Sequence, residues 1–303
     1  MSLGFSKKLI DSLVCQQDGA PLVVLEIQQE NEFVIFSAKL KCQQCDKIYN
    51  IQQGILNCLL EQGKMKQLMQ DEVEARDKEA EQYDQRLSVR YHKEIPSTMK
   101  TIGNWSGRKV LEYGCGTGRL TTVIAPECRA VLATDFSLIS LQILAKKLDN
   151  YKNVGLVLSN AVQFKAKSKY FDLATSFQFL EHVPSKEQRL TWLGLVKKTL
   201  KSSGEFVSTV YHYDWRKQKD NQNREGKHGS GIFFHYFTQE ELANEVTGYF
   251  QVQDLHPIDI TLPLEAKLKL PAKIAGQLSR VFEKISIANK FGHLLIVKAI
   301  KNK

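Results

Sequence analysis

Residues 110–120, VLEYGCGTGRL, place three glycines at alternating positions directly after an apolar run. Glycine adopts a positive φ without steric cost and lets a ligand approach the backbone closely. A glycine-rich loop that follows a strand is therefore typical of a cradle for a bound molecule. We expect the ligand site to lie around Gly114, Gly116 and Gly118.

The composition predicts one large globular unit with room for a small second domain. The chain has 303 residues, of which 43% are hydrophobic and 25% charged, which is enough to bury one extended core. No apolar run approaches the roughly 18 residues of a membrane-spanning helix, and the first residues lack the apolar core of a signal peptide. We therefore expect a cytoplasmic protein.

The net charge of +9 is unevenly distributed along the chain. Residues 263–303 contain nine Lys or Arg against Glu265 and Glu283, a local net charge of +7. A basic segment of this kind can bind RNA, anionic lipid or an acidic substrate, or it can be a solvated helix face.

Composition and periodicity divide the chain into three parts. Residues 1–60 alternate apolar and polar positions around turns, which predicts a small β-rich domain. Residues 61–100 are charged and helix-favouring, which predicts a helical linker and helices that cover the ligand. Residues 101–303 alternate strands with helices, which predicts a parallel sheet with helices on both faces. Two insertions are expected in this part, a substrate insertion at about 212–237 and a helical one at about 264–288.

Two common nucleotide motifs do not fit the glycine loop. A dinucleotide fingerprint needs a third glycine where this chain has Arg119, and a phosphate-binding P-loop needs Gly-Lys-Ser/Thr. Together with Glu112, Asp135 after the second strand, and LEHV after the fourth strand, the loop resembles the motifs of class I S-adenosylmethionine-dependent methyltransferases. The resemblance covers roughly residues 75–212 and implies a Rossmann-like α/β sheet.

The resemblance also implies how S-adenosylmethionine is bound. Asp135 would accept hydrogen bonds from both ribose hydroxyls, and Glu112 would orient the amino group of the cofactor. Asn160 stands where the family usually has Asp at the adenine contact. The implied cofactor-binding residues are Glu112, Gly114, Cys115, Gly116, Gly118, Asp135, Phe136, Asn160, Ala161, Phe177 and Gln178.

The implied reaction is attack of a nucleophile on the methyl group of a sulfonium. Because the leaving group is already activated, the protein mainly supplies orientation, and a base is needed only when the nucleophile carries a proton. His182 and His212 follow the fourth and fifth strands and are the candidate catalytic bases. The alternative for His182 is a histidine that only caps a helix or faces solvent.

The N-terminal segment contains a set of candidate metal ligands. Its cysteines, the tyrosine and the Gly-Ile turn resemble the Trm112-like small zinc domain, but Asp18 occupies the position of the second cysteine, beside Cys15, Cys42 and Cys45. A structural zinc ion takes four ligands, usually thiolate or imidazole, although a carboxylate can serve. Either a Cys₃Asp zinc site survives with weakened affinity, or the metal has been lost; we favour loss.

Three functions are compatible with these features. The first is a methyltransferase for a small or lipid-like metabolite, with peripheral membrane contact by the basic C-terminal region as one further expectation. The second is an RNA methyltransferase, supported by the charge, although SFQF stands where many base-modifying enzymes have Asn/Asp-Pro-Pro-Tyr/Phe. The third is a non-catalytic scaffold that binds the cofactor or a partner.

Overall fold

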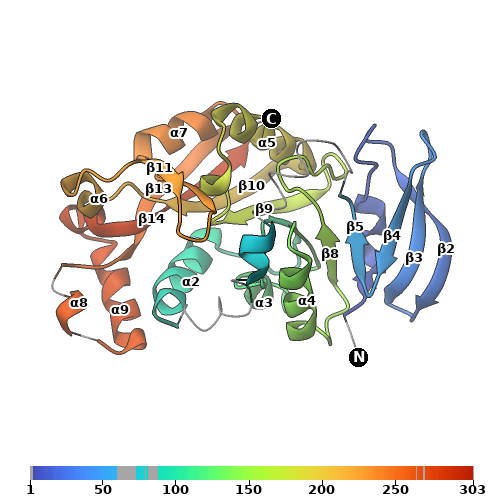
Figure 1. The fold of residues 1–303 in the computed structure, drawn as a ribbon, viewed down its shortest axis with the longest axis horizontal. Coiled ribbons are helices and arrows are strands. Elements are labelled where there is room, and N and C mark those ends of the chain that lie inside the picture. Colours follow the sequence, from blue (N-terminus) through green and yellow to red (C-terminus); the bar gives the residue numbers. More distant parts are fainter. Residues whose placement is uncertain are drawn as a thin grey trace.

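The structure is a computed structural model that describes residues 3–59, 73–78, 80, 88–263, 265–268 and 270–302. One large sheet runs through the molecule, with helices on both of its faces (Figure 1). This architecture confirms the expected α/β class. Half of the helical linker expected at 61–100 lies outside the described residues; the described half is residues 73–78 and 80 together with helix α2 (Ser88–Ile102) up to residue 100.

The central part of the sheet has five parallel strands, followed by two strands that are added through successive antiparallel pairings. In spatial order these are β8 (Val154–Leu158), β7 (Ala130–Asp135), β6 (Lys109–Tyr113), β9 (Phe171–Phe177), β10 (Leu200–Tyr211), β14 (Gly292–Lys301) and β13 (Phe250–Ile260). The connections run outward in both directions from β6. The carboxyl ends of β6, β7 and β9 therefore meet at one edge, where open α/β sheets bind ligands.

Helices bury both faces of these strands, which explains their nearly continuous apolar sequences. On one face lie α2, α3 (Thr121–Ile124) and α4 (Leu138–Lys147), and on the other α5 (Lys186–Thr199) and α7 (Gln239–Thr247) (Figure 1). Each face has its own core of buried side chains. Leu144 of α4 belongs to the first core and Trp192 of α5 to the second.

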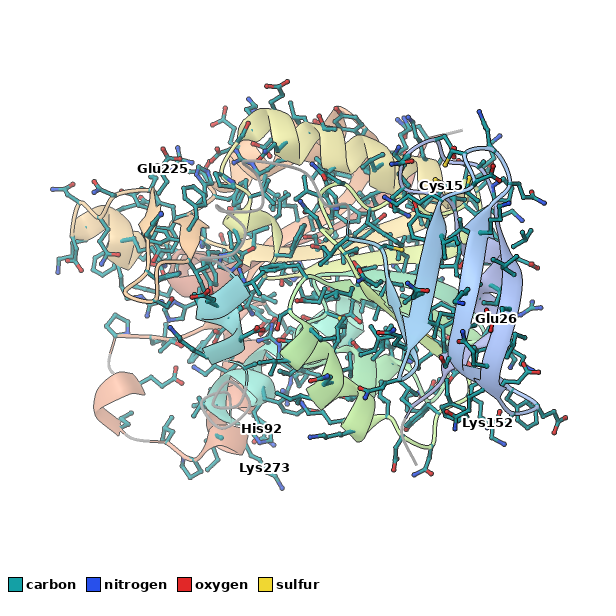
Figure 2. All side chains as sticks on the ribbon, turned by 45° about the vertical axis from the view of Figure 1, so that its right-hand side comes forward. Cys15, Glu26, His92, Lys152, Glu225 and Lys273 are labelled. Atoms are coloured by element: carbon teal, nitrogen blue, oxygen red, sulfur yellow. The ribbon has the colours of Figure 1, made fainter. Side chains whose placement is uncertain are left out.

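The N-terminal residues extend the same sheet. The elements are β1 (Phe5–Ser6), the 3₁₀ helix η1 (Lys7–Ser12), β2 (Leu22–Glu30), β3 (Val34–Cys42), β4 (Ile48–Gln52) and β5 (Ile55–Asn57). Strand β5 pairs in parallel with β8, with Ile55 opposite Leu156, so that the sheet has twelve strands. These strands form one end of the molecule, where Figure 2 labels Cys15 and Glu26. The division into separate domains stays a prediction, because hydrogen bonding continues across its boundary.

The C-terminal half carries helical and hairpin additions at the two places where insertions were expected. The first comprises α6 (Trp215–Lys219) and a hairpin of β11 (Glu225–Lys227) and β12 (Phe233–His235). The second comprises α8 (Glu265–Leu268), α9 (Ala272–Phe282) and the 3₁₀ helix η3 (Ser286–Phe291). Within the described ranges, the helices are too short or too polar to cross a membrane.

Candidate functional site

The glycine loop between β6 and α3 has a left-handed backbone at each of its three glycines. The φ angles are 68° at Gly114, 52° at Gly116 and 85° at Gly118. A Cβ atom on Gly118 would lie 2.0 Å from Cδ1 of Leu144, whereas one on Gly116 would meet nothing within 4 Å. Gly118 is therefore needed to pack the loop on α4, and Gly116 borders open space.

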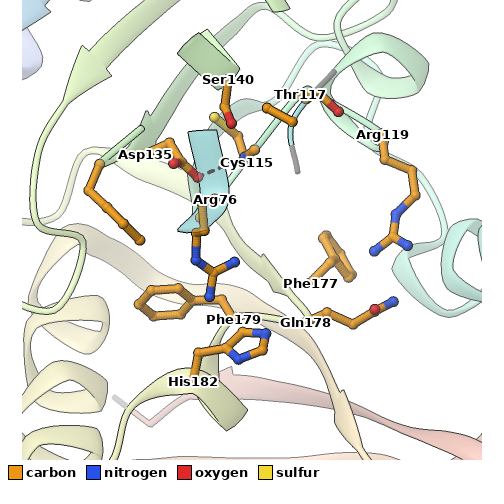
Figure 3. A pocket seen from close by; sticks show the side chains of 14 residues that line it. Arg76, Cys115, Thr117, Arg119, Asp135, Ser140, Phe177, Gln178, Phe179 and His182 are labelled. Carbon is orange, nitrogen blue, oxygen red and sulfur yellow. Dashed lines mark hydrogen bonds between the residues drawn. The ribbon is translucent and has the colours of Figure 1, made fainter. Parts of the chain in front are cut away.

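Asp135 joins the end of β7 to this loop. Its Oδ2 atom accepts a hydrogen bond from the Gly116 amide at 2.8 Å, drawn as a dashed line in Figure 3, and its Oδ1 accepts one from the Ser137 amide at 2.9 Å. The carboxyl group is buried, and burial raises its pKa although the backbone hydrogen bonds oppose that shift. Each oxygen has a further lone pair for another donor.

A cleft opens beside this loop, and we call it the glycine-loop cleft. Figure 3 shows Asp135 and Arg119 on opposite sides of it, with Phe177 and Gln178 from the end of β9 between them and His182. The residues that line it are Arg76, Ala80, Gly114, Cys115, Gly116, Thr117, Arg119, Asp135, Phe136, Ser140, Phe177, Gln178, Phe179 and His182.

Two arginines and a buried glutamate at the cleft were missed by sequence reasoning. Arg119 forms an ion pair with Glu94 of α2 at 2.9 Å, and Gln178 Nε2 donates to the same carboxylate at 2.8 Å. Arg76 lies 5.4 Å from the ring centroid of Phe136. Buried charges cannot be recognised from periodicity, and only the position of Arg119 directly after the glycine loop could have indicated it.

Four of the residues expected at the cofactor lie near the cleft but outside its lining, as far as the described residues define it. Glu112 is buried and accepts a hydrogen bond from Thr121 Oγ1 at 2.7 Å, and burial raises its pKa to about 7. Asn160 Oδ1 accepts from the Val162 amide at 3.2 Å, which turns the loop after β8. Gly118 lies beneath the loop, and Ala161 is buried.

His182 ends the 3₁₀ helix η2 (Leu180–His182) and lines the cleft. Its Nδ1 is 2.7 Å from the carbonyl oxygen of Phe233. A carbonyl only accepts hydrogen bonds, so Nδ1 carries the proton and Nε2 of the neutral ring has a free lone pair. Desolvation, helped by the charge of Arg76, holds the pKa of His182 well below its usual range, so the ring is neutral at pH 7.

His212 has a different environment. Its Nδ1 lies 2.8 Å from the carbonyl oxygen of Gly292, and its side chain is buried at the junction of β10 and β14. Burial lowers its pKa. Within the described part of the chain, His212 belongs to the lining of neither the glycine-loop cleft nor the cavity beside it.

That second cavity, which we call the ring-lined cavity, adjoins the cleft at Gln178. Its lining residues are Gln178, Tyr211, Lys217, His228, Tyr236, Asp259, His293 and Leu294. The ring of His182 contacts the rings of Tyr211 and His228, with centroids 5.6 and 6.5 Å apart. His182 and Gln178 therefore stand between the two spaces, and residues 212–237 contribute Lys217, His228 and Tyr236 to the wall of the second one.

Glu181 is an unusual neighbour of this junction. Its side chain is fully buried, and neither carboxyl oxygen has a hydrogen-bond partner among the described residues. Burial raises its pKa to about 8. An unpaired carboxyl group in such a place is costly when charged, so the group is largely protonated at neutral pH.

The four candidate metal ligands meet at the N-terminal end of the molecule. The Sγ atoms of Cys15 and Cys45 are 3.6 Å apart, and Cys42 Sγ lies 3.5 Å from both carboxylate oxygens of Asp18. One ligand atom from each of the four side chains lies within 4.8 Å of the others. Zinc–sulfur bonds of about 2.3 Å in a tetrahedron place two sulfurs about 3.8 Å apart. The donor set and its spacing therefore fit one zinc ion.

Over residues 75–249 the chain matches the family described as a methyltransferase domain. Among curated proteins it is 30% identical, over 132 residues, to demethylmenaquinone methyltransferase of Bacillus licheniformis. That alignment covers 41% of this chain and 56% of the relative, so the chain spans little more than half of its length.

Solved structures of low sequence identity share the fold. One is a chain from the complex between the Haloferax volcanii Trm112 methyltransferase activator and a methyltransferase, with a TM-score of 0.56 at 13% identity, covering 75% of this chain and 98% of that one. Another is the 1,6-didemethyltoxoflavin-N1-methyltransferase of Burkholderia thailandensis with S-adenosylhomocysteine bound, with a TM-score of 0.54 at 17% identity and coverages of 86% and 98%. By sequence the chain belongs to the methyltransferase-domain family, and its fold is that of S-adenosylmethionine-dependent methyltransferases.

Proposed function

We propose that the protein transfers the methyl group of S-adenosylmethionine to a small-molecule acceptor. The observation that carries this proposal is the junction of two spaces at Gln178 and His182, with the glycine-loop cleft on one side and the ring-lined cavity on the other. Methyl transfer needs this arrangement, because donor and acceptor must approach from opposite sides of the moving carbon.

The groups of the cleft match those of the cofactor. Asp135 offers a lone pair on each oxygen to the two ribose hydroxyls, and Arg119, across the cleft in Figure 3, offers a guanidinium to the cofactor carboxylate. The backbone at Gly116 allows close approach. We assign supporting roles to Gly118 and Glu112, which pack the loop and hold Thr121, while Asn160 and Ala161 stay predicted adenine contacts.

In this proposal the cofactor supplies a methyl group on a good leaving group. The bond from methyl carbon to sulfur breaks, the sulfur keeps the electron pair, and a bond from the acceptor to carbon forms. Where the acceptor carries a proton, the neutral Nε2 of His182 takes it, because Nδ1 is fixed as the donor to Phe233. His212 is not assigned this role, since its Nδ1 is bonded to Gly292 and its ring lies away from both spaces.

The ring-lined cavity supports an aromatic acceptor of small size. Tyr211, His228 and Tyr236 present rings to it, and planar ligands stack favourably on such surfaces. The relative from Bacillus licheniformis is named for demethylmenaquinone, which makes a quinol the first acceptor to try. Release of S-adenosylhomocysteine from S-adenosylmethionine with a short-chain demethylated quinol, but not with transfer RNA, supports this acceptor class; the reverse result supports the RNA alternative.

A pair of glycine variants tests the cofactor site. Gly107 and Gly116 both have positive φ, and a Cβ on either would meet nothing within 4 Å. Gly116→Ala and Gly107→Ala should therefore carry similar backbone strain, about 1–2 kcal/mol. By calorimetry, only Gly116→Ala should lose affinity for S-adenosylhomocysteine, because its methyl group enters the cleft. Equal affinity of the two variants for S-adenosylhomocysteine would show that the cleft is not the cofactor site.

We further propose that Cys15, Asp18, Cys42 and Cys45 bind one structural zinc ion. The spacing of their ligand atoms supports this choice over the loss of metal favoured on sequence grounds. Asp18 then acts as the fourth ligand, and its carboxylate also accepts the Ala20 amide at 2.8 Å, which would fix its orientation.

A further inference from the structure

We propose that the outward face of α9 is a docking surface for an anionic lipid bilayer. This surface consists of Ile274, Leu278 and Val281 of α9, and the segments before and after α9 in the chain add the exposed side chains of Leu268, Ile285 and Ile287. We call it the α9 face.

Helix α9 packs on α2 through small residues. Ala275, Gly276 and Ser279 are buried, and a Cβ on Gly276 would come within 2.2 Å of the His92 carbonyl oxygen. The close approach of the two backbones is thus made by the small side of α9. In Figure 2, His92 and Lys273 mark the neighbouring parts of the two helices. This small-residue side is therefore the side of α9 that is buried against the rest of the protein.

The large apolar residues of α9 lie on the other side. At 3.6 residues per turn, Ile274, Leu278 and Val281 span roughly 60° of arc, and the centre of this stripe is roughly 140° from the small buried side. Ile274 is 46% exposed and Val281 is 55% exposed. Just outside the helix, Leu268 and Ile287 reach 64% and 73%. An apolar stripe that faces away from the core marks an interaction surface rather than ordinary surface scatter.

The charges around this stripe favour an anionic bilayer over other occupants. Lys273 and Lys284 are exposed next to the stripe, within a C-terminal region whose net charge is +7. Lysines next to exposed large apolar side chains are typical of helices that lie in the interface plane of anionic membranes. A second copy of this chain would bring two positively charged rims together, which disfavours self-association through this face.

The α9 face is held in a fixed place relative to the glycine-loop cleft. Three successive residues of α2 contact three different parts: His92 packs on α9, Lys93 Nζ donates to Thr261 Oγ1 at 2.8 Å and to Glu265 of α8, and Glu94 binds Arg119. Docking would therefore set the height and orientation of the cleft above the bilayer.

Vesicle co-sedimentation tests the proposal with purified full-length protein. The vesicles are phosphatidylcholine alone and phosphatidylcholine with 30 mol% phosphatidylglycerol. The apolar variant is Ile274→Ser with Val281→Ser, and its matched control is Leu25→Ser with Ile27→Ser, which removes equally exposed residues from β2 at the far end of the molecule. The charge variant is Lys273→Glu with Lys284→Glu, and its control is Lys8→Glu with Lys186→Glu. Thermal melts check that each variant is folded.

The wild type should bind the anionic vesicles and bind phosphatidylcholine much more weakly. The apolar variant should lose at least about tenfold in partitioning, and the charge variant about fivefold for each lysine removed, while both controls bind like the wild type. The proposal is overturned if folded wild type does not bind the anionic vesicles, or if the α9 variants bind as well as their controls. It is also overturned if the α9 variants instead abolish a concentration-dependent dimer.

Discussion

The carboxylate of Asp135 and the amide of Gly116 are joined by a hydrogen bond of 2.8 Å. Asp135 ends strand β7, whereas Gly116 lies in the loop that follows strand β6. The bond fixes the glycine loop against the end of β7 and aims the remaining lone pairs of Asp135 at the cleft. Parallel pairing of β6 and β7, with Tyr113 opposite Thr134, brings these two ends together. The backbone of the glycine loop and the carboxylate of Asp135 are thus parts of one hydrogen-bonded site.

Replacing Asp135 should weaken cofactor binding. Hydrogen bonds to charged groups contribute roughly 1.5–3 kcal/mol, so Asp135→Ala should lose about 10- to 150-fold in affinity for S-adenosylhomocysteine by calorimetry. Affinity of the wild type should also fall on acidification, beginning above the usual range of aspartate because burial raises this pKa. Asp254→Ala, on an exposed part of β13, is the control, and unchanged affinity in Asp135→Ala would refute the assignment.

Glu181 should make the protein less stable as the pH rises. Its pKa of about 8 in the fold lies above the ordinary glutamate value of 4.5, so the native state holds a proton that the unfolded state releases. Between those two values the unfolded state binds fewer protons, and the free energy of unfolding therefore decreases with increasing pH.

Glu181→Gln removes this dependence. Urea unfolding should show the variant close to wild type at pH 5 and more stable by on the order of 4 kcal/mol at pH 8.5, because the pKa of Glu181 rises from 4.5 to about 8 and each pKa unit corresponds to about 1.4 kcal/mol. The exposed Glu240→Gln serves as the control. A variant that is less stable than wild type at pH 8.5 would show that Glu181 is charged and paired in the fold.

The sequence predicts most strands of the sheet, and it also proposes a place for the ligand site. The runs at 109–113 and 154–158 are short, apolar and bounded by turns, and the structure has strands at those bounds. Asp135 could be singled out because it ends the second strand at the position where the methyltransferase family that the sequence resembles has its acidic ribose contact. These features are local, and local patterns are what a single sequence reports.

Long-range pairings carry no such local signal. Ile55 lies opposite Leu156, although the pattern around either residue is compatible with any neighbouring strand. The buried pair of Arg119 and Glu94 joins residues that hydropathy alone would place at the surface. His182 and His212 both follow strands at the same edge, and only tertiary hydrogen bonds to Phe233 and Gly292 distinguish their directions.

The metal site should respond to changes in its ligand set. Elemental analysis of purified protein should find one zinc per chain, and Cys42→Ser should lose it together with about 5 °C of melting temperature. Asp18→Cys should bind zinc more tightly in chelator competition, since thiolate is a better zinc ligand than carboxylate. Cys128→Ser, outside the cluster, should keep the metal. Wild type without zinc would restore the expectation that the metal was lost.

The basic C-terminal region distinguishes the two acceptor classes. If RNA were the acceptor, Lys and Arg of residues 263–303 would neutralise phosphates, and the logarithm of affinity would fall with that of salt by about 0.7 for each contact on a single strand. The exposed Lys273 and Lys284 instead flank an apolar stripe, and binding to a phosphate backbone does not require such a stripe. We expect fluorescence anisotropy with labelled transfer RNA to show binding no tighter than about 1 µM at 0.15 M salt, a strength typical of non-specific attraction. Submicromolar, steeply salt-dependent binding that Lys273→Glu with Lys284→Glu abolishes would favour RNA as the acceptor and assign these lysines to it.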